Sequence, residues 1–332
     1  MLSRAIRSQL AFSDHFLSHC YYKQSRKFSG NNLKNFRVTG CVAAPFTPFR
    51  ENGDINFDKF GESADYFNNN NIPYAFVNGT VGEGMSMTVD ERKESAEAWV
   101  KVAKGKVKII LHVGANNIRD SQELARHGSS IGVDAIASLC PSFFKPANEE
   151  IVTECISEIA GAAPDLPFFY YSIDYLTGIN VDPSKILQRA RDRVPNLVGV
   201  KHTSKEVRKV YNSSLVDPSR FQVLMGTEAE FLPYFSLGFD FPVTLPYMGT
   251  LFYNLKTAHD SGDKHTALKI QARMFELDTI RGKYGAGIEV AKAMFGIISE
   301  IDVGPVRLPI TKLTTDTYQL LKSDLVAFGP VN

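Results

Sequence analysis

Short apolar segments alternate with longer amphipathic segments along the chain from Val38 onward. The short segments are rich in β-branched and aromatic residues. Most of them are apolar throughout, a pattern typical of strands that are buried on both faces. Eight segments have this character, and we expect strands at residues 40–45, 75–78, 107–113, 135–140, 168–172, 197–201, 221–225 and 241–244.

The intervening segments resemble helices, and some carry helix start signals. Thr88 precedes an acidic first turn at Asp90 and Glu91, and Asp182 is followed by Pro183, which suits the first turn of a helix. Helices are expected at residues 58–69, 89–103, 118–131, 149–162 and 182–191. Strands that alternate with helices through short connections predict a parallel sheet.

This order of elements predicts an α/β fold. Eight strands between residues 40 and 245 favour a closed (β/α)8 TIM barrel. The alternative is a doubly wound open sheet with a second domain, but the chain contains no linker rich in Gly, Pro or Ser. We therefore expect a single domain over residues 38–332, in which residues 263–283, 287–300 and 312–328 form three additional C-terminal helices.

Charge separates the first 37 residues from the rest of the chain. Residues 1–37 hold seven basic side chains and one acidic one, a net charge of +6, whereas the remaining 295 residues hold 30 and 35, a net charge of −5. A basic, Ser-rich and acid-poor segment is typical of a mitochondrial transit peptide; the alternative is a disordered N-terminal extension. The mildly acidic remainder argues against nucleic acid as a partner.

Other features of the composition exclude further classes of protein. No apolar stretch approaches the roughly 20 residues that span a bilayer, so no membrane partner is expected. The four cysteines, Cys20, Cys41, Cys140 and Cys155, show no paired spacing, which indicates reduced thiols in an intracellular protein. The seven histidines are scattered and form no metal-binding motif, so no metal site is expected.

Two polar side chains in the expected strands are candidates for catalysis. Lys201 ends the strand at 197–201, where burial would disfavour its charged form, and a neutral lysine amine attacks a carbonyl to form a Schiff base. Tyr171 lies in the strand at 168–172, and its phenol can transfer protons. Each also has a structural interpretation. Lys201 would reach solvent or pair with a carboxylate, and Tyr171 would pack as an aromatic with one hydrogen bond.

A glycine-rich segment, residues 78–84 (NGTVGEG), follows the second expected strand. Its backbone N–H groups can point at an anion ahead of the next helix. It has neither the Gly-Lys-Ser/Thr ending of a P-loop nor the GxGxxG spacing of a dinucleotide site. An ordinary tight turn explains the same residues, so the segment taken alone is a weak signal.

Together, these strand ends resemble the dihydrodipicolinate synthase/N-acetylneuraminate lyase family of Schiff-base aldolases, and its animal members most of all. The similarity runs from about Val38 to Pro309. The order of the matching segments and their spacing along a barrel make the similarity specific. The segments that carry it are APFTPF (44–49), NGTVGEG (78–84), FFYYSI (168–173), LTG (176–178), GVK (199–201) and PVRLP (305–309).

The resemblance implies the reversible cleavage of a sialic acid into an N-acetylhexosamine and pyruvate. Lys201 matches the Schiff-base lysine, and Tyr171 matches the tyrosine that transfers protons. The pair Thr80 and Val81 matches the site that holds the substrate carboxylate. The positions that match sugar contacts are Thr203, Gly226 and Glu228. The resemblance also implies that no cofactor is required and that the protein is a cytoplasmic homotetramer.

Several positions depart from the family pattern. Val81 replaces the second hydroxyl of the carboxylate site, which removes a hydrogen bond of about 1.5–3 kcal/mol. The acidic pair that contacts the sugar reads Glu228 and Ala229 here. After the last strand, Thr244 and Leu245 stand where the family has Gly and Ser, and Leu245 gives a sugar hydroxyl no partner.

Three functions therefore remain open. The first is an aldolase that acts on N-acetylneuraminate. The second is a Schiff-base aldolase for another 2-keto acid, with altered sugar specificity. The third is a catalytically degenerate barrel with a binding role. Small molecules are the expected partners of the first two. Cytoplasm is the expected compartment, with mitochondria as the alternative if residues 1–37 act as a transit peptide.

Overall fold

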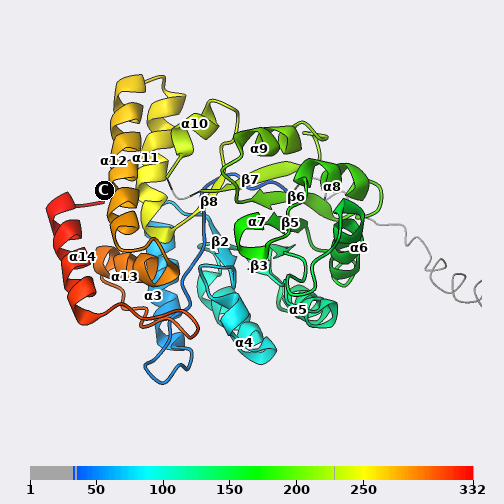
Figure 1. Ribbon diagram of the computed structural model, residues 1–332, viewed down its shortest axis with the longest axis horizontal. Helices are drawn as coiled ribbons and strands as arrows, with labels where there is room; N and C mark the ends of the chain where they lie inside the picture. Colours follow the sequence, from blue (N-terminus) through cyan, green and yellow to red (C-terminus); the bar gives the residue numbers. More distant parts are fainter. Residues whose placement is uncertain (1–32, 34–35, 228, 332) are drawn as a thin grey trace, which may run out of the picture. The chain divides into compact units, whose positions relative to one another are not determined.

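The eight apolar segments form parallel strands that close into a barrel (Figure 1). The computed structural model describes residues 33, 36–227 and 229–331. Each strand pairs with the next one along the chain, and β8 pairs with β1, which confirms the expected (β/α)8 barrel. The strands are β1 (Val42–Ala43), β2 (Tyr74–Val77), β3 (Lys108–His112), β4 (Ala135–Ser138), β5 (Phe168–Ser172), β6 (Leu197–His202), β7 (Gln222–Gly226) and β8 (Pro242–Thr244).

Side chains along the strands alternate between the barrel interior and the layer beneath the helices, as the pleat of a strand requires. On β5, Phe169 and Tyr171 belong to one apolar cluster, whereas Phe168 and Tyr170 belong to another that includes helical residues. On β6, Val200 packs in this outer layer, so the next residue, Lys201, points into the barrel. The alternation thus brings Tyr171 and Lys201 to the same side of the sheet.

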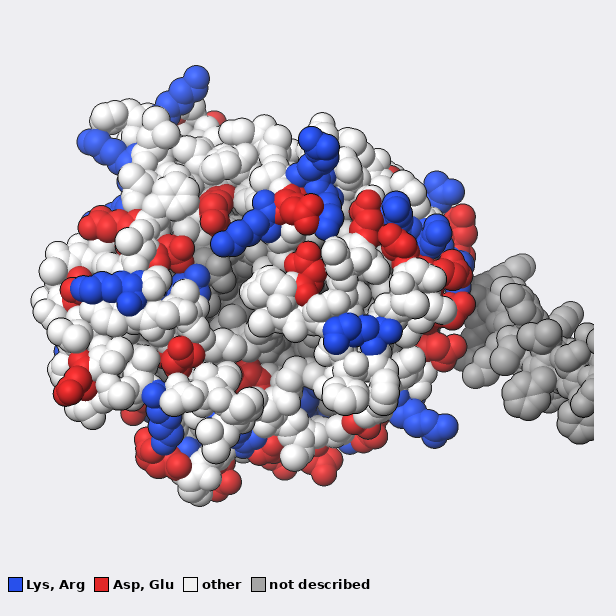
Figure 2. Space-filling model, in the orientation of Figure 1, with Lys and Arg blue, Asp and Glu red and all other residues white. Residues whose placement is uncertain are grey.

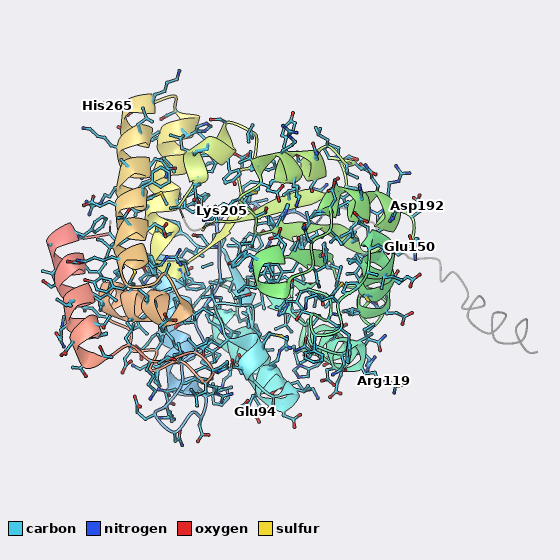
Figure 3. All side chains as sticks on the ribbon, in the orientation of Figure 1. Glu94, Arg119, Glu150, Asp192, Lys205 and His265 are labelled. Atoms are coloured by element: carbon cyan, nitrogen blue, oxygen red, sulfur yellow. The ribbon has the colours of Figure 1, made fainter. Side chains whose placement is uncertain are left out.

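Helices surround the barrel, and all five of those expected between the strands are present. Their charged side chains point outward, as Glu94, Arg119 and Glu150 show in Figure 3. Thr88 caps α4 with a reciprocal capping box to Glu91. The barrel helices are α3 (Phe60–Asn69), α4 (Val89–Ala103), α5 (Ile118–Ile131), α6 (Glu149–Ala160), α8 (Pro183–Ala190), α9 (Val207–Ser214), α10 (Phe231–Phe235) and α11 (Gly249–Asp260). The last three of these, and α7 (Asp174–Thr177), have no strong signal in the sequence.

Three further helices follow the barrel, as expected from the C-terminal sequence. They are α12 (Lys264–Lys283), α13 (Ile288–Ser299) and α14 (Thr315–Phe328). Figure 1 shows them together on one side of the barrel, next to α11. They share an apolar cluster with residues of α10, of α11 and of the segment after β8, built on Met274, Leu277, Val290, Met294 and Leu321. The C-terminal helices are therefore packed against the barrel and share a core with it.

The expectation for the N-terminal extension falls almost entirely on positions outside the described residues. Within residues 33, 36–227 and 229–331, no helix is long and apolar enough to cross a membrane. Figure 2 shows basic and acidic side chains interspersed over one face of the molecule, with no extended area of a single sign.

Candidate active site

A cavity of about 60 Å³ lies at the carboxyl-terminal ends of the strands. Barrel enzymes place their catalytic groups at this end. Seven of the nine predicted site residues line the cavity: Lys201, Tyr171, Thr80, Val81, Thr203, Gly226 and Leu245. The other lining residues are Ala44, Ile173, Tyr175, Thr227, Val243 and Thr244. Residues from six different strand ends and the loops after them thus converge on one small space.

Lys201 lies inside the barrel and is only 5% exposed. It is paired in register with Tyr171 on the neighbouring strand. Its Nζ atom lies 3.9 Å from the ring centroid of Tyr171 and 4.2 Å from that of Phe76. An ammonium over aromatic faces is stabilised by the ring quadrupoles. The lysine therefore stands in the cavity with its amine confined between two rings, and does not reach out to solvent.

Tyr171 connects the lysine to the glycine-rich loop. Its hydroxyl lies 3.1 Å from Thr80 Oγ1, a hydrogen bond in which either group can donate. Its ring packs against Phe76 and, edge-on, against His112, with centroid separations of 5.5 and 5.7 Å. The side chain is 2% exposed. The hydroxyl is therefore held in one place, beside both the lysine and the loop.

Close packing fixes the path of the loop at residues 78–84. Asn78 has a φ of +57°, and its side chain bonds the Arg92 carbonyl at 2.9 Å and the Ser95 hydroxyl at 2.8 Å. A Cβ at Gly84 would lie 2.0 Å from the Asn78 carbonyl oxygen, so only glycine fits there. The Thr47 hydroxyl donates to the Gly82 carbonyl at 2.6 Å. These contacts, several of them to the loop's own backbone, fix the conformation of residues 78–84.

Within this loop, Thr80 and Val81 both face the cavity, but only Thr80 offers a side-chain hydroxyl. Val81 is half-buried and packs against the apolar clusters of the barrel and of the C-terminal helices. A carboxylate in the cavity would therefore find one hydroxyl and the backbone N–H groups of the loop as donors. The loop thus presents a single side-chain hydroxyl to the cavity.

The cavity also contains two buried hydroxyls, one just after β6 and one on β8. Thr203 Oγ1 and Thr244 Oγ1 have no hydrogen-bond partner within the described part of the chain. A Cβ at Gly226 would lie 2.0 Å from Thr203 Oγ1, so glycine at this position is needed for Thr203 to lie where it does. An unsatisfied buried hydroxyl is costly, which makes both groups suitable partners for a polar ligand. Leu245 adds an apolar surface beside them.

Of the two remaining predicted residues, the structure describes only Ala229, which does not line the cavity. Ala229 is 1% exposed and packs with the C-terminal helices, and its carbonyl accepts a hydrogen bond of 2.6 Å from Gln271 Nε2. Glu228 lies outside the described residues. The nearby Glu230 accepts a hydrogen bond from the Thr227 hydroxyl, and Thr227 does line the cavity. Thr227 is therefore an additional polar group at this side of the site.

The sequence interpretation missed two aromatic rings that support the site. Phe76 lies under the Lys201 amine, and His112 packs against both Phe76 and Tyr171. His112 Nδ1 lies 3.1 Å from the Asn78 carbonyl. Burial, together with the nearby charges of Arg92 and Lys201, holds the pKa of His112 well below its usual value. The sequence signal that could have found these two rings is the alternation of side chains along β2 and β3. It directs Phe76 and His112 into the barrel near the strand ends.

Arg92 places a buried guanidinium behind the loop. It is 3% exposed and donates to the carbonyls of Gly114 at 2.8 Å and His112 at 2.7 Å. Burial lowers its pKa to about 10, so it stays protonated at neutral pH. This cation contributes a positive potential near Asn78, at the base of the loop. That potential favours an anion at the loop.

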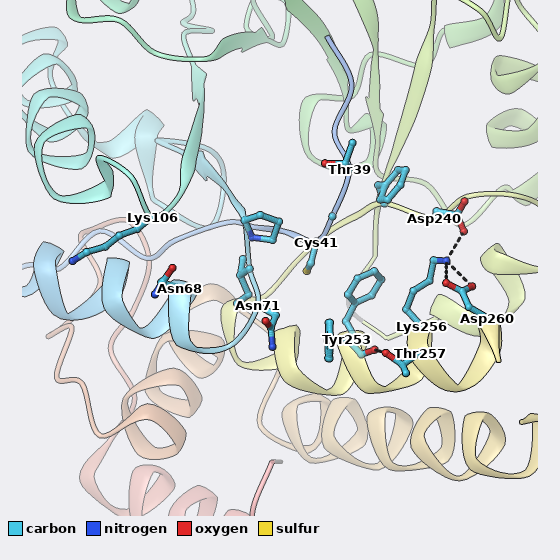
Figure 4. Close-up of a pocket in the computed structure, with 15 residues that line it drawn as sticks. Thr39, Cys41, Asn68, Asn71, Lys106, Asp240, Tyr253, Lys256, Thr257 and Asp260 are labelled. Carbon is cyan, nitrogen blue, oxygen red and sulfur yellow. Dashed lines mark hydrogen bonds and ion pairs between the residues drawn. The ribbon is translucent and has the colours of Figure 1, made fainter. Parts of the chain in front are cut away.

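A larger cavity lies at the opposite end of the barrel and holds none of the predicted residues. Its volume is about 550 Å³, and residues just before β1, β2 and β8 line it. Figure 4 shows Lys256 between Asp240 and Asp260 at its edge, with Nζ to oxygen distances of 3.4 Å to the first and 2.6 Å to the second. The single lysine thus bridges two carboxylates. Within the described ranges, no group of three or more His, Cys, Asp or Glu side chains is placed to hold a metal ion.

Comparisons with known proteins show the family to which the chain is related. The sequence model of the Dihydrodipicolinate synthetase family matches residues 37–328. The chain is 36% identical to N-acetylneuraminate lyase of Rattus norvegicus over 287 residues, which cover 84% of this chain and 89% of that protein. It is 37% identical to N-acetylneuraminate lyase of Danio rerio over 297 residues, which cover 88% of this chain and 97% of that protein.

Solved structures lead to the same family. N-acetylneuraminate lyase (sialic acid aldolase) from Aliivibrio salmonicida has a TM-score of 0.84 and 30% identity, covering 89% of this chain and 98% of that one. N-acetylneuraminate lyase of Proteus mirabilis has a TM-score of 0.85 and 28% identity, with coverage of 89% and 99%. The resemblance seen in the sequence is thus confirmed over most of the chain, and the protein belongs to the dihydrodipicolinate synthetase family.

Proposed function

We propose that this protein is a Schiff-base (class I) aldolase that reversibly cleaves N-acetylneuraminate to N-acetyl-D-mannosamine and pyruvate. The observation that carries the proposal is the arrangement of three groups in one cavity. The Lys201 amine lies over the Tyr171 ring, and the Tyr171 hydroxyl is bonded to Thr80 on an anion-binding type of loop. Relatives with the same architecture bear the name N-acetylneuraminate lyase.

The proposed reaction begins at the lysine. The Lys201 amine attacks the C2 carbonyl of the 2-keto acid, and the Tyr171 hydroxyl gives its proton to the oxygen that leaves as water, so that a protonated imine and a Tyr171 phenolate result. The imine accepts the electron pair of the C3–C4 bond as that bond breaks, while Tyr171 takes the proton from the C4 hydroxyl and the aldehyde leaves. The resulting enamine is protonated at C3, and water hydrolyses the imine to release pyruvate. These steps use only groups of the chain and water.

Thr80 and the loop backbone have a separate role in this proposal. They hold the substrate carboxylate so that C2 lies beside the Lys201 amine, which makes the attack effectively intramolecular. The Thr80 hydroxyl also fixes the position of the Tyr171 hydroxyl. On the far side, Thr203 and Thr244 offer hydroxyls to the sugar half of the substrate.

Pyruvate release from N-acetylneuraminate by the purified protein tests the proposal. Borohydride reduction in the presence of pyruvate, followed by peptide mass analysis, tests the imine separately. We expect release of pyruvate and a reduced pyruvate adduct on Lys201. An adduct without cleavage of sialic acid would instead support the second candidate, an aldolase for another 2-keto acid. A folded protein that gives neither result would support a non-catalytic role.

The second candidate is favoured by the apolar surface at Leu245, and it leads to a prediction. The substitution Leu245→Ser replaces the apolar side chain with a hydroxyl for the sugar and leaves Thr244 in place. We expect it to raise kcat/KM for N-acetylneuraminate about tenfold, the effect of one hydrogen bond of ordinary strength. Steady-state kinetics on sialic acid measures this.

Leu245→Ala is the matched control for this substitution, because it removes the apolar side chain without adding a donor. Its kcat/KM is expected to stay near that of the unsubstituted protein. Equal gains in the control and in Leu245→Ser would show that space, rather than a hydrogen bond, limits the sugar. A loss of activity in Leu245→Ser alone would contradict a sugar substrate of this shape.

We further propose that the protein assembles as a homotetramer. Four large apolar side chains are exposed around the ends of β4 and β5: Phe143, Phe144, Tyr175 and Leu176, at 77%, 84%, 66% and 58%. Exposed apolar groups that gather in this way are typical of interaction sites. Mass photometry is expected to give four times the chain mass, and Phe144→Ser is expected to lower it. A monomer at micromolar concentration would contradict the assembly.

Two proposals concern the organisation and location of the chain. Residues 38–332 act as a single catalytic domain, and residues 1–37 act as a separate basic extension. The protein acts in the cytoplasm, or in mitochondria if the extension is a transit peptide. Fusion of residues 1–37 to a fluorescent protein distinguishes the two compartments, since only a transit peptide would move the reporter into mitochondria.

A further inference from the structure

We propose that Lys292 is a positioning residue for the active site, and that it acts through Glu83 on the loop that carries Thr80 and Val81. Lys292 belongs to α13, outside the barrel, and is not among the residues that line the active-site cavity. The inference rests on the proposed function, because it assigns to that loop the binding of the substrate carboxylate. It adds to that function a residue from the C-terminal helices.

The Lys292 ammonium is buried and fully bonded. The residue is 2% exposed. Its Nζ atom donates to the Thr47 carbonyl at 2.8 Å, to Glu83 Oε1 at 2.9 Å and to the Pro305 carbonyl at 2.7 Å. An ammonium has three N–H groups, and here each has an acceptor. The three acceptors belong to the loop after β1, the loop after β2 and the segment after α13.

Glu83, which accepts the bond from Lys292, belongs to the glycine-rich loop at residues 78–84. Its side chain is fully buried, and its second oxygen accepts a hydrogen bond of 2.8 Å from the Arg307 backbone N–H. Its φ is +53°, in the left-handed region that non-glycine residues rarely adopt. Such a conformation persists only where the surroundings hold it. The bonds from Lys292 and Arg307 are the contacts that hold the Glu83 side chain.

The bonds to this loop fall on successive residues that lead toward the cavity. Thr47 binds the Gly82 carbonyl, Lys292 binds Glu83, and the same Thr47 presents its own carbonyl to Lys292. Val81 and Thr80 come next in the chain and face the cavity. The set of Thr47, Gly82, Glu83 and Lys292, which we call the loop anchor, therefore lies directly behind the donors that the substrate carboxylate would meet.

The segment after α13 strengthens the loop anchor from a second direction. The Arg307 guanidinium binds Glu91 of the α4 capping box, with one nitrogen to oxygen distance of 2.8 Å, and it donates to the Gly53 carbonyl. Glu91 and Thr88 together begin α4, the helix that follows the loop. The C-terminal segment thus holds both the loop and the start of the next helix.

The charge state of Lys292 makes the loop anchor sensitive to pH. Burial lowers the pKa of Lys292 to about 8, against the opposing influence of Glu83 and, more weakly, Asp302; the charge of Arg307 lowers it further. Glu289, one helical turn before Lys292, lines together with it a cavity of about 360 Å³ beside α13. Below about pH 8 the ammonium satisfies all three acceptors. Above it, a neutral amine has only two N–H groups, so one acceptor loses its donor.

Substitution of Lys292, read out through pyruvate binding, tests the inference. The probe is pyruvate, titrated in the borohydride reaction that labels Lys201, so the half-saturating concentration reports on the loop. We expect Lys292→Met to raise that concentration about tenfold, the effect of one lost hydrogen bond to a charged group, while labelling at saturation stays complete. The steady-state KM for N-acetylneuraminate should rise in parallel, with a smaller change in kcat.

Further variants separate positioning from folding. The double variant Glu83→Gln with Lys292→Met leaves no lone charge buried, so it should fold even if the single variant does not, and it should still bind pyruvate weakly. Lys292→Arg keeps its charge at high pH. It should retain most of the affinity and move the alkaline loss of pyruvate binding to higher pH. Lys283→Met, which breaks a surface ion pair with Asp324 on the C-terminal helices, is the matched control and should change nothing.

A folded Lys292→Met or double variant whose half-saturating pyruvate concentration lies within twofold of the unsubstituted protein would overturn the inference and leave the proposed function intact. An equal rise in the Lys283→Met control would also overturn it, because the effect would then come from loosening of the C-terminal helices in general. If the unsubstituted protein forms no adduct at all, the proposed function fails, and the assignment of Lys292 fails with it.

Discussion

Lys201→Met is expected to abolish the cleavage of N-acetylneuraminate, with a fall in kcat of about 10⁴-fold or more. Methionine fills much of the space of the lysine stem but has no amine, so no imine can form. Between the rings of Phe76 and Tyr171 an apolar side chain is well tolerated, and a buried ammonium no longer has to be desolvated. The variant should therefore fold with a Tm equal to or above that of the unsubstituted protein.

Measurement of kcat, of borohydride labelling and of Tm on the same preparation checks this expectation. The control is Lys205→Met, four residues later in an exposed position of the loop after β6. Figure 3 shows Lys205 near the middle of the view. It should retain both activity and the adduct on Lys201. Residual turnover in Lys201→Met above about one part in a thousand would mean that another group carries the chemistry.

Tyr171→Phe is expected to lower kcat by about 10²–10⁴-fold, the usual contribution of a positioned acid or base. The ring stays in place, so the packing with Phe76 and His112 is retained. The hydroxyl that takes the proton from the C4 oxygen is lost, and Thr80 Oγ1 loses its partner. The adduct between pyruvate and Lys201 should still form, because the attacking amine is unchanged.

Tyr170→Phe is the matched control for this substitution. Tyr170 is the preceding residue of the same strand and is equally buried, but it packs in the layer beneath the helices. Loss of its hydroxyl should change Tm more than kcat. Rapid-quench measurement of the cleavage step separates the two variants. Comparable losses of kcat in both would show that the hydroxyl of Tyr171 acts through packing and not through proton transfer.

The barrel was predictable because its strands are short and apolar on both faces, which leaves a clear signal at each of them. Lys201 and Tyr171 were predictable for the same reason. A polar residue at the end of such a strand must point either into the barrel or beneath a helix, and the alternation on β5 and β6 sends both inward. Strand pattern therefore predicts the centre of the site well.

The edges of the site were less predictable, because they depend on contacts far apart in the sequence. Ala229 lies away from the cavity wall because Gln271 of α12 binds its carbonyl. Lys292 lies among apolar residues of α13, and its acceptor at Thr47 is 245 positions away. His112 resembles any histidine in a strand until Phe76 and Tyr171 are placed against it. No local pattern contains this information.

During synthesis of the chain, the loop anchor is completed late, after all the strands have been made. All eight strands end by Thr244, whereas Lys292 and Pro305 come near the carboxyl terminus. A nascent chain on the ribosome therefore holds Lys201 and Tyr171 well before it can hold Glu83 in its final conformation. A late part of the protein therefore completes the loop anchor, so a chain that stops short of α13 contains Lys201 and Tyr171 but lacks the contacts from Lys292 and Arg307 that hold Glu83.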